Sequence, residues 1–326
     1  MISVILGLSH EGRVNQGGAK RAARCYETTA TKLKPPMSRI AYVNGAYRPL
    51  AEAAIHIEDR GFQFADGVYE VIYRHAGRLV DLDLHLARLQ RSLRELSLAL
   101  PVSPAALNAI LAEVARRNRL DSGLFYMQVT RGSAPRLHSF PPPGTACTLV
   151  VTMRRALPFP ASLRDWQAAA ITMPDTRWAR CDIKSVSLLP NVLAREAARQ
   201  AGAQEAIFHD AHGMVTEGAA TSVFIVDATG TLRTRALGPE ILPGCTRDAL
   251  LAHLAESGMA VETRGFSLAE MRAAREIFIT AATTFVKPVT SLDGAAVGDG
   301  VPGPVAERLF AWISGHITGR RNIALA

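Results

Sequence analysis

The segment RCDIKSVSLLPNVLA, residues 180–194, carries one lysine, Lys184, in a largely apolar stretch of sequence. Removal from water disfavours the ammonium form of a lysine, so its amine becomes more available to attack a carbonyl carbon. Pro190 and Gly202 predict a helix that begins just after the lysine and ends before residue 202. Because most lysines lie on solvated surfaces, a reactive role for Lys184 depends on what the rest of the chain brings to it.

Two further segments have residue types that suit a phosphorylated pyridine cofactor. Glu217 precedes an apolar run in VTEGAATSVFIV. A carboxylate there either remains a solvated loop residue or holds a pyridine nitrogen protonated, which makes the ring an electron sink. Gly244, Cys245 and Thr246 begin a predicted helix and would present free N–H groups to an anion. Arg88 could add a forked donor to the same anion or remain an exposed helix residue.

A third segment could recognise a carboxylate. Arg136 and His138 lie two residues apart in the proline-containing loop RGSAPRLHSFPPPG, so both side chains could point the same way. Taken singly, an arginine and a histidine in a loop are ordinary surface residues.

The composition is that of a globular protein rather than a membrane or nucleic-acid-binding one. The 326 residues are 48% hydrophobic and 20% charged, and no apolar run is long enough to span a bilayer. Residues 1–36 hold six Lys or Arg and two Glu, which is half of the net charge of +8. The remaining arginines are dispersed among acids, so nucleic-acid binding is only a distant alternative. Four scattered cysteines indicate a reducing, cytoplasmic location without disulfides or a metal site.

Strands and helices alternate along most of the chain. Asn44-Gly45 predicts a hairpin, and strands are expected at 67–73, 124–130, 148–153, 168–172, 205–209, 231–235 and 277–280. Leucines spaced by three and four from 82 to 100 predict a helix, with His85 and Arg88 off the apolar stripe. Further helices are expected at 104–117, from Gly244 to Gly258, and at 304–317.

This alternation predicts a mixed α/β (α+β) fold with two domains and a cleft between them. The proline-rich stretch RRALPFPA places the boundary near residue 155, which gives a small domain at 39–155 and a larger one at 156–326. Residues 1–38 have little periodicity and are expected to be a disordered extension or a mis-called start upstream of Met37.

Five segments in this order resemble the fold-type IV pyridoxal-phosphate enzymes, the class IV aminotransferases. They are RGFQFADGVYEV, VTRGSAPRLH, RCDIKSVSLLPNVLA, VTEGAATSVF and ILPGCTRD. The resemblance spans about residues 40–305, and the segment with Arg136 and His138 favours the D-amino acid aminotransferase branch. It implies an active site in the inter-domain cleft and pyridoxal 5′-phosphate as cofactor.

The resemblance also implies roles for individual residues. Lys184 is similar to the lysine that forms a Schiff base with the cofactor, and Glu217 to the partner of the ring nitrogen. The other implied cofactor contacts are Arg88, Leu242, Cys245, Thr246 and Ala282. Tyr69, Arg136 and His138 are similar to a trap for the substrate carboxylate in which the arginine and histidine come from a second subunit, so a homodimer is implied. In TAATT, Ala281 and Ala282 depart from the family because they stand where hydroxyl residues commonly contact the phosphate.

We therefore expect ping-pong transamination between a D-amino acid of the D-alanine type and a 2-oxo acid, 2-oxoglutarate or pyruvate. Three alternatives share the cofactor: a branched-chain L-amino acid aminotransferase, an (R)-amine transaminase and an aminodeoxychorismate lyase.

Overall fold

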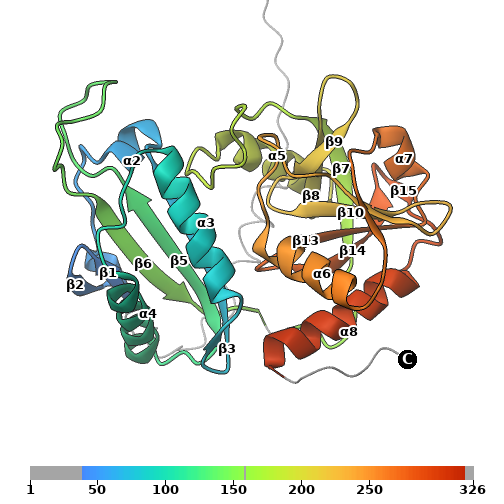
Figure 1. The fold of residues 1–326 in the computed structure, drawn as a ribbon, viewed down its shortest axis with the longest axis horizontal. Helices are drawn as coiled ribbons and strands as arrows, with labels where there is room; N and C mark the ends of the chain where they lie inside the picture. Colours follow the sequence, from blue (N-terminus) through green and yellow to red (C-terminus); the bar gives the residue numbers. More distant parts are fainter. Residues whose placement is uncertain (1–38, 158, 320–326) are drawn as a thin grey trace, which may run out of the picture. The chain divides into compact units, whose positions relative to one another are not determined.

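The computed structural model describes residues 39–157 and 159–319, so the expectations for residues 1–38 lie outside the described part of the chain. Two sheets with flanking helices follow one another along the sequence (Figure 1). The predicted mixed α/β (α+β) class is confirmed. The first sheet ends at residue 154 and the second begins at 168. The domain boundary near residue 155 stays a prediction.

The first sheet has six strands in the order β2-β1-β6-β5-β3-β4, and every neighbouring pair is antiparallel. The strands are β1 (Ile40–Val43), β2 (Ala46–Pro49), β3 (Gly67–His75), β4 (Arg78–Leu79), β5 (Gly123–Thr130) and β6 (Thr148–Arg154). Its helices are η1 (Leu50–Glu52), α2 (Arg60–Phe64), α3 (Leu82–Glu95) and α4 (Pro104–Asn118). The predicted hairpin is present, and both of its turn residues, Asn44 and Gly45, have positive φ.

The helix predicted from the leucine spacing is shorter than that spacing suggests. α3 ends at Glu95, although Leu96 and Leu100 continue the pattern. Ser97 adopts a left-handed conformation, and the N–H groups of Ser97 and Leu98 bond back to the carbonyls of Arg94 and Leu93. This Schellman arrangement satisfies the last helical carbonyls and stops the helix. The leucines beyond it still pack against the core between α3, α4 and the sheet.

The second sheet has nine strands. Eight follow the order β12-β11-β10-β13-β14-β7-β8-β9, and β15 pairs with β14. The strands are β7 (Ala168–Pro174), β8 (Glu205–His209), β9 (Val215–Gly218), β10 (Ser222–Val226), β11 (Leu232–Thr234), β12 (Val261–Thr263), β13 (Glu276–Ala281), β14 (Phe285–Leu292) and β15 (Ala295–Ala296). The helices are α5 (Leu189–Gln200), α6 (Cys245–Glu256), α7 (Leu268–Arg272) and α8 (Pro304–Thr318).

Both faces of the second sheet are buried. Along β10, Phe224 and Val226 belong to one apolar cluster with α6 and α8, whereas Val223 and Ile225 belong to another with α7. This two-sided burial explains why residues 223–226, VFIV, are all apolar rather than alternating with polar residues. α5 packs its alanines against β7 and β8 at another part of the sheet.

The sequence does not predict β12, β14, β15, α2 or α7, and it leaves open whether Glu217 is a loop residue. The structure places Glu217 inside β9. β14 was hard to recognise because Pro288 interrupts an otherwise β-prone run, yet it pairs with β13 and β7. Within the described ranges, no helix is long and apolar enough to cross a membrane.

Candidate active site

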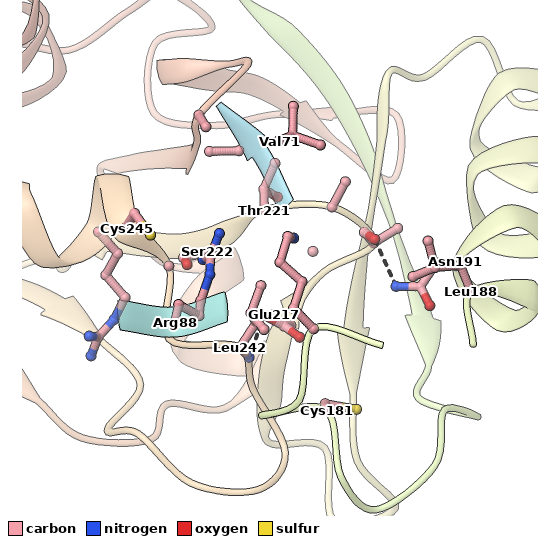
Figure 2. Close-up of a pocket in the computed structure, with 18 of the residues that line it drawn as sticks. Val71, Arg88, Cys181, Leu188, Asn191, Glu217, Thr221, Ser222, Leu242 and Cys245 are labelled. Carbon is pink, nitrogen blue, oxygen red and sulfur yellow. Dashed lines mark hydrogen bonds between the residues drawn. The ribbon is translucent and has the colours of Figure 1, made fainter. Parts of the chain in front are cut away.

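One cavity collects eight of the ten residues that the sequence singled out (Figure 2). Its volume is about 190 Å³, whereas a single water needs only roughly 10–15 Å³. The walls come from β3 and α3 of the first sheet's layer, and from the ends of β9, β10 and β13 with the segments that precede α5 and α6. The eight residues are Tyr69, Arg88, Lys184, Glu217, Leu242, Cys245, Thr246 and Ala282.

Lys184 lies in an irregular segment that is fastened to β3. Its carbonyl accepts a hydrogen bond from the N–H of Tyr69 at 3.0 Å, and its own N–H donates to the Ser92 hydroxyl at 3.2 Å. Ser185 forms an isolated bridge with Val68. These bonds fix the lysine backbone, and Nζ lies 4.3 Å from the ring centroid of Tyr69. The amine therefore enters the cavity beside an aromatic face that can stabilise its cation.

Glu217 is buried but remains hydrogen-bonded through both oxygens. Oε1 accepts a hydrogen bond from Nη1 of Arg177. Oε2 accepts one from the N–H of Leu242 at 3.1 Å (Figure 2). Burial raises the pKa of Glu217 to about 7, against the pull of the Arg177 guanidinium. A carboxyl group whose pKa lies near neutrality on a cavity wall is typical of a functional site.

The start of α6 forms an anion-binding end of the cavity. Gly244 precedes the helix without a side-chain cap, so the first helical N–H groups have no intrahelical partner. A Cβ at Gly244 would lie only 2.8 Å from Oγ of Ser222, which explains why glycine stands here. Cys245 and Thr246 line the cavity at this end.

Arg88 brings positive charge to the same end. Its Nε and Nη2 bind the two carboxylate oxygens of Glu70 at 2.7 and 2.8 Å, and Nη1 donates to the carbonyl of Pro243 at 2.8 Å. Burial opposes the ionisation of Glu70, but Arg88 and His85 hold its pKa at about 2. Because Glu70 compensates the charge of Arg88, Arg88 and His85 can be buried although they lie outside the leucine stripe of α3.

Two other hydroxyl residues lie on the cavity wall that Ala281 and Ala282 also line. Ser222 and Thr280 also line the cavity, and they are register partners on β10 and β13. Register partners place their side chains on the same sheet face. Thr280 is 2% exposed, and its Oγ1 has no hydrogen-bond partner in the described part of the chain. An orphaned hydroxyl, an uncapped helix start and an arginine together fit a phosphate group.

Arg136 and His138 are not among the residues that line this cavity. They lie in the loop between β5 and β6, where both pack against Phe64 of α2. The Arg136 guanidinium is 4.9 Å from the Phe64 ring centroid, and the His138 ring is 5.4 Å from it. Within one chain, the structure therefore separates these two residues from the other predicted site residues.

Sequence analysis missed the ion pairs that support the site. Arg177 contacts Glu217 and also pairs with Asp175, while Glu70 binds both Arg88 and His85. The spacing Asp-x-Arg after a strand is a weak sequence signal for the pair of Asp175 and Arg177. Glu70 gave no signal, because an acid on an alternating strand normally faces solvent.

Comparison with known proteins supports the resemblance. A family model described as amino-transferase class IV matches residues 67–292. D-alanine aminotransferase from Bacillus licheniformis is 41% identical over 270 residues, which are 82% of this chain and 93% of that protein. D-alanine aminotransferase from Listeria monocytogenes is 38% identical over 80% of this chain and 90% of its own length.

Solved structures show the same fold. A branched-chain amino acid aminotransferase from T.th., in complex with N-(5′-phosphopyridoxyl)-L-glutamate, is 27% identical with a TM-score of 0.77, and the match covers 87% of this chain and 95% of that one. The Escherichia coli branched-chain enzyme has a TM-score of 0.79 at 24% identity, over 89% of this chain and 98% of the other. The predicted fold class is thus confirmed, and both matches cover most of the chain.

Proposed function

This chain belongs to the class IV aminotransferases, and from that premise we propose that it exchanges the amino group of a D-amino acid of the D-alanine type with a 2-oxo acid such as 2-oxoglutarate or pyruvate. The observation that carries the proposal is the placement of Lys184, Glu217 and the start of α6 on one cavity. The two D-alanine aminotransferases named above are 41% and 38% identical to this chain, whereas the two branched-chain enzymes named above are 27% and 24% identical. The D-amino acid is therefore favoured over a branched-chain L-amino acid.

The cofactor of this reaction is pyridoxal 5′-phosphate, which supplies an electron sink for the charge that develops at the substrate Cα. Arg88, Thr246, the N–H groups at the start of α6 and the hydroxyls of Ser222 and Thr280 would hold its phosphate. Glu217 would face its ring nitrogen, with Leu242 beside the ring. Lys184 would bind it covalently.

The protein residues then divide the chemistry between them. Nζ of Lys184 accepts the proton from the substrate Cα and later returns it, because it is the amine that faces the cavity beside Tyr69. Glu217, with its backbone donor at Leu242, stabilises positive charge at the far side of the cavity. Amino acid and oxo acid use this one site in turn, which predicts ping-pong kinetics.

Product analysis under single-turnover conditions tests the handedness. The holoenzyme, mixed with D-alanine and no acceptor, is expected to release about one equivalent of pyruvate per site, whereas L-leucine should release far less of its oxo acid. The matched comparison is L-alanine, which has the same side chain. Faster release of the oxo acid from L-leucine than of pyruvate from D-alanine would favour the alternative of a branched-chain L-amino acid aminotransferase.

A homodimer would complete the site, because Arg136 and His138 lie away from this chain's own cavity. Apolar side chains are exposed on both surfaces that such a dimer would use. Leu189, Val192 and Leu193 on α5 are 68%, 58% and 62% exposed, and Leu137 and Phe140 in the loop with Arg136 are 63% and 61% exposed. A second copy that covers these surfaces would bring Arg136 towards the partner's cavity.

Arg136→Ala tests the carboxylate trap. Loss of a charged hydrogen-bond donor is expected to raise the KM for D-alanine roughly 10- to 100-fold with a smaller change in kcat. Arg164→Ala, which changes an exposed arginine, is the control. Mixed dimers of Arg136→Ala and Lys184→Ala chains should regain the wild-type KM for D-alanine at one of their two sites, because that site has both residues intact. An unchanged KM in Arg136→Ala, or mixed dimers that keep its raised KM, would contradict a trap that acts between subunits.

A reducing cytoplasm suits this function. The three cysteines in the described part of the chain, Cys147, Cys181 and Cys245, are all free.

A further inference from the structure

We propose that Arg177 and Asp175 are positioning residues that set the charge of Glu217, and that Arg177 is shared between two carboxylates so that one negative charge is left for the cofactor ring. The inference rests on the proposed function, because it assigns Glu217 to the ring nitrogen. The charge of Glu217 would thus depend on the pair of Arg177 and Asp175, which follows β7 and is not among the residues expected to touch cofactor or substrate.

The contacts of Arg177 are directional and buried. Its Nε and Nη2 bind the two oxygens of Asp175 at 2.9 and 2.6 Å, while Nη1 donates to Oε1 of Glu217. Nη2 also donates to the carbonyl of Glu240 at 3.1 Å, and the guanidinium lies 4.8 Å from the ring centroid of Phe208. A forked guanidinium held at this many points has one orientation, and that orientation aims a single N–H at Glu217.

Asp175 is fixed from the other side. Its Oδ2 accepts a hydrogen bond from the hydroxyl of Thr216 at 2.7 Å, and Thr216 is the residue before Glu217 in β9. The N–H of Arg177 donates to Oδ1 of Asp175 at 3.1 Å. These bonds favour the ionised carboxylate, so the pKa of Asp175 is lowered despite burial, which opposes ionisation. Asp175 therefore competes with Glu217 for the charge of Arg177.

Other groups also face Glu217. Lys184 approaches from the segment before α5, and its charge lowers the pKa of Glu217 in the same direction as Arg177 does. Cys181 approaches from the same segment, and burial raises the pKa of its thiol to about 12, so it is neutral. The loop before α6 contributes only the N–H of Leu242. Behind Gly218, the carboxyl group of Glu205 on β8 has its own partner, Arg195, at 3.1 Å.

The charges of the three groups predict the direction in which the pKa of Glu217 shifts when Arg177 or Asp175 is replaced. With both acids ionised, Asp175, Glu217 and Arg177 sum to one negative charge, which complements one protonated ring nitrogen. Without Arg177, two buried carboxylates would face each other without their cation, and Glu217 would take up a proton. Without the charge of Asp175, Arg177 would serve Glu217 alone, and Glu217 would ionise more easily. A merely structural role would not give opposite shifts.

The test is the titration of Glu217 in the cofactor-free protein, followed by NMR of ¹³C-labelled glutamate carboxyl groups. The resonance that is lost in Glu217→Gln identifies the group. Arg177→Gln is expected to raise its pKa by about 1–3, and Asp175→Asn is expected to lower it. In the holoenzyme, the acid limb of kcat/KM should move in the same two directions. Arg177→Lys keeps the positive charge, so the pKa of Glu217 in this variant should lie closer to that of the wild type. Arg177→Lys is also the substitute variant if Arg177→Gln does not fold.

Arg233→Gln is the matched control, since Arg233 is likewise shared between acids, here Asp227, Glu262 and Glu270, but does not line the cavity. It should leave the Glu217 titration unchanged. Shifts of the same sign in Arg177→Gln and Asp175→Asn, or no shift in either, would overturn the proposal. Opposite shifts in a protein that fails to transfer the amino group of D-alanine would support it and overturn the proposed function instead.

Discussion

Replacement of Lys184 by alanine is expected to reduce turnover with D-alanine by roughly 10²- to 10⁴-fold or more, because it removes the amine that moves the Cα proton. The main-chain carbonyl and N–H of Lys184 bond to the N–H of Tyr69 and the hydroxyl of Ser92. An alanine keeps both main-chain groups, so the substitution leaves these bonds available. The loss should therefore appear in kcat and kcat/KM with little change in the free energy of unfolding. Steady-state kinetics and chemical denaturation on the same preparation measure both.

Lys287→Ala is the matched control for this experiment. Nζ of Lys287 lies 4.3 Å from the ring centroid of Trp166, the same distance as between Lys184 and Tyr69, but Lys287 does not line the cavity. It should retain near-normal turnover. The proton-transfer role of Lys184 would be refuted by near-normal turnover of Lys184→Ala. Added small amines should partly restore the variant, because they can accept the proton in place of Nζ.

Glu217→Gln is expected to lower kcat by roughly 10²- to 10³-fold, because an amide of the same shape cannot supply the negative charge. The wild type should lose activity towards acidic pH, where the carboxylate becomes protonated, because burial raises the pKa of Glu217. Glu217→Gln should lack that acid limb. A pH profile of kcat from both proteins distinguishes loss of charge from loss of shape, and an unchanged profile would contradict the assignment.

The same substitution should change the pH dependence of stability in the cofactor-free protein. The pKa of Glu217 is raised from 4.5 to about 7 in the folded state, so the folded state holds this proton more tightly than the unfolded state does. The resulting stabilisation is present below pH 4.5 and is lost as pH rises through about 7. The Tm of Glu217→Gln relative to wild type should therefore be higher at about pH 8 than at about pH 5. Glu262→Gln, at an exposed carboxylate on β12, should show no such trend.

Much of the fold was predictable because its elements have strong local signals. The Asn44-Gly45 turn, the Pro190 helix start and the Gly244 helix start depend on backbone preferences of single residues, which act whatever the rest of the chain does. β14 and the end of α3 were less predictable. Pro288 is tolerated inside β14, and α3 stops at a serine in a left-handed conformation, for which serine has no strong preference.

The candidate site likewise has features that the sequence predicted and features that only the folded structure shows. The sequence by itself determined the family, because five motifs occur in a recognisable order. It also predicted Lys184, Glu217 and the helix start at Gly244 as site residues, since the chemistry requires these residue types. It did not show that Arg88 is paired with Glu70, or that Arg177 stands between Asp175 and Glu217. Only the tertiary structure decided these charges. Ionisation of a buried group depends on desolvation and on partners far away in the chain, and only the folded molecule brings those partners together.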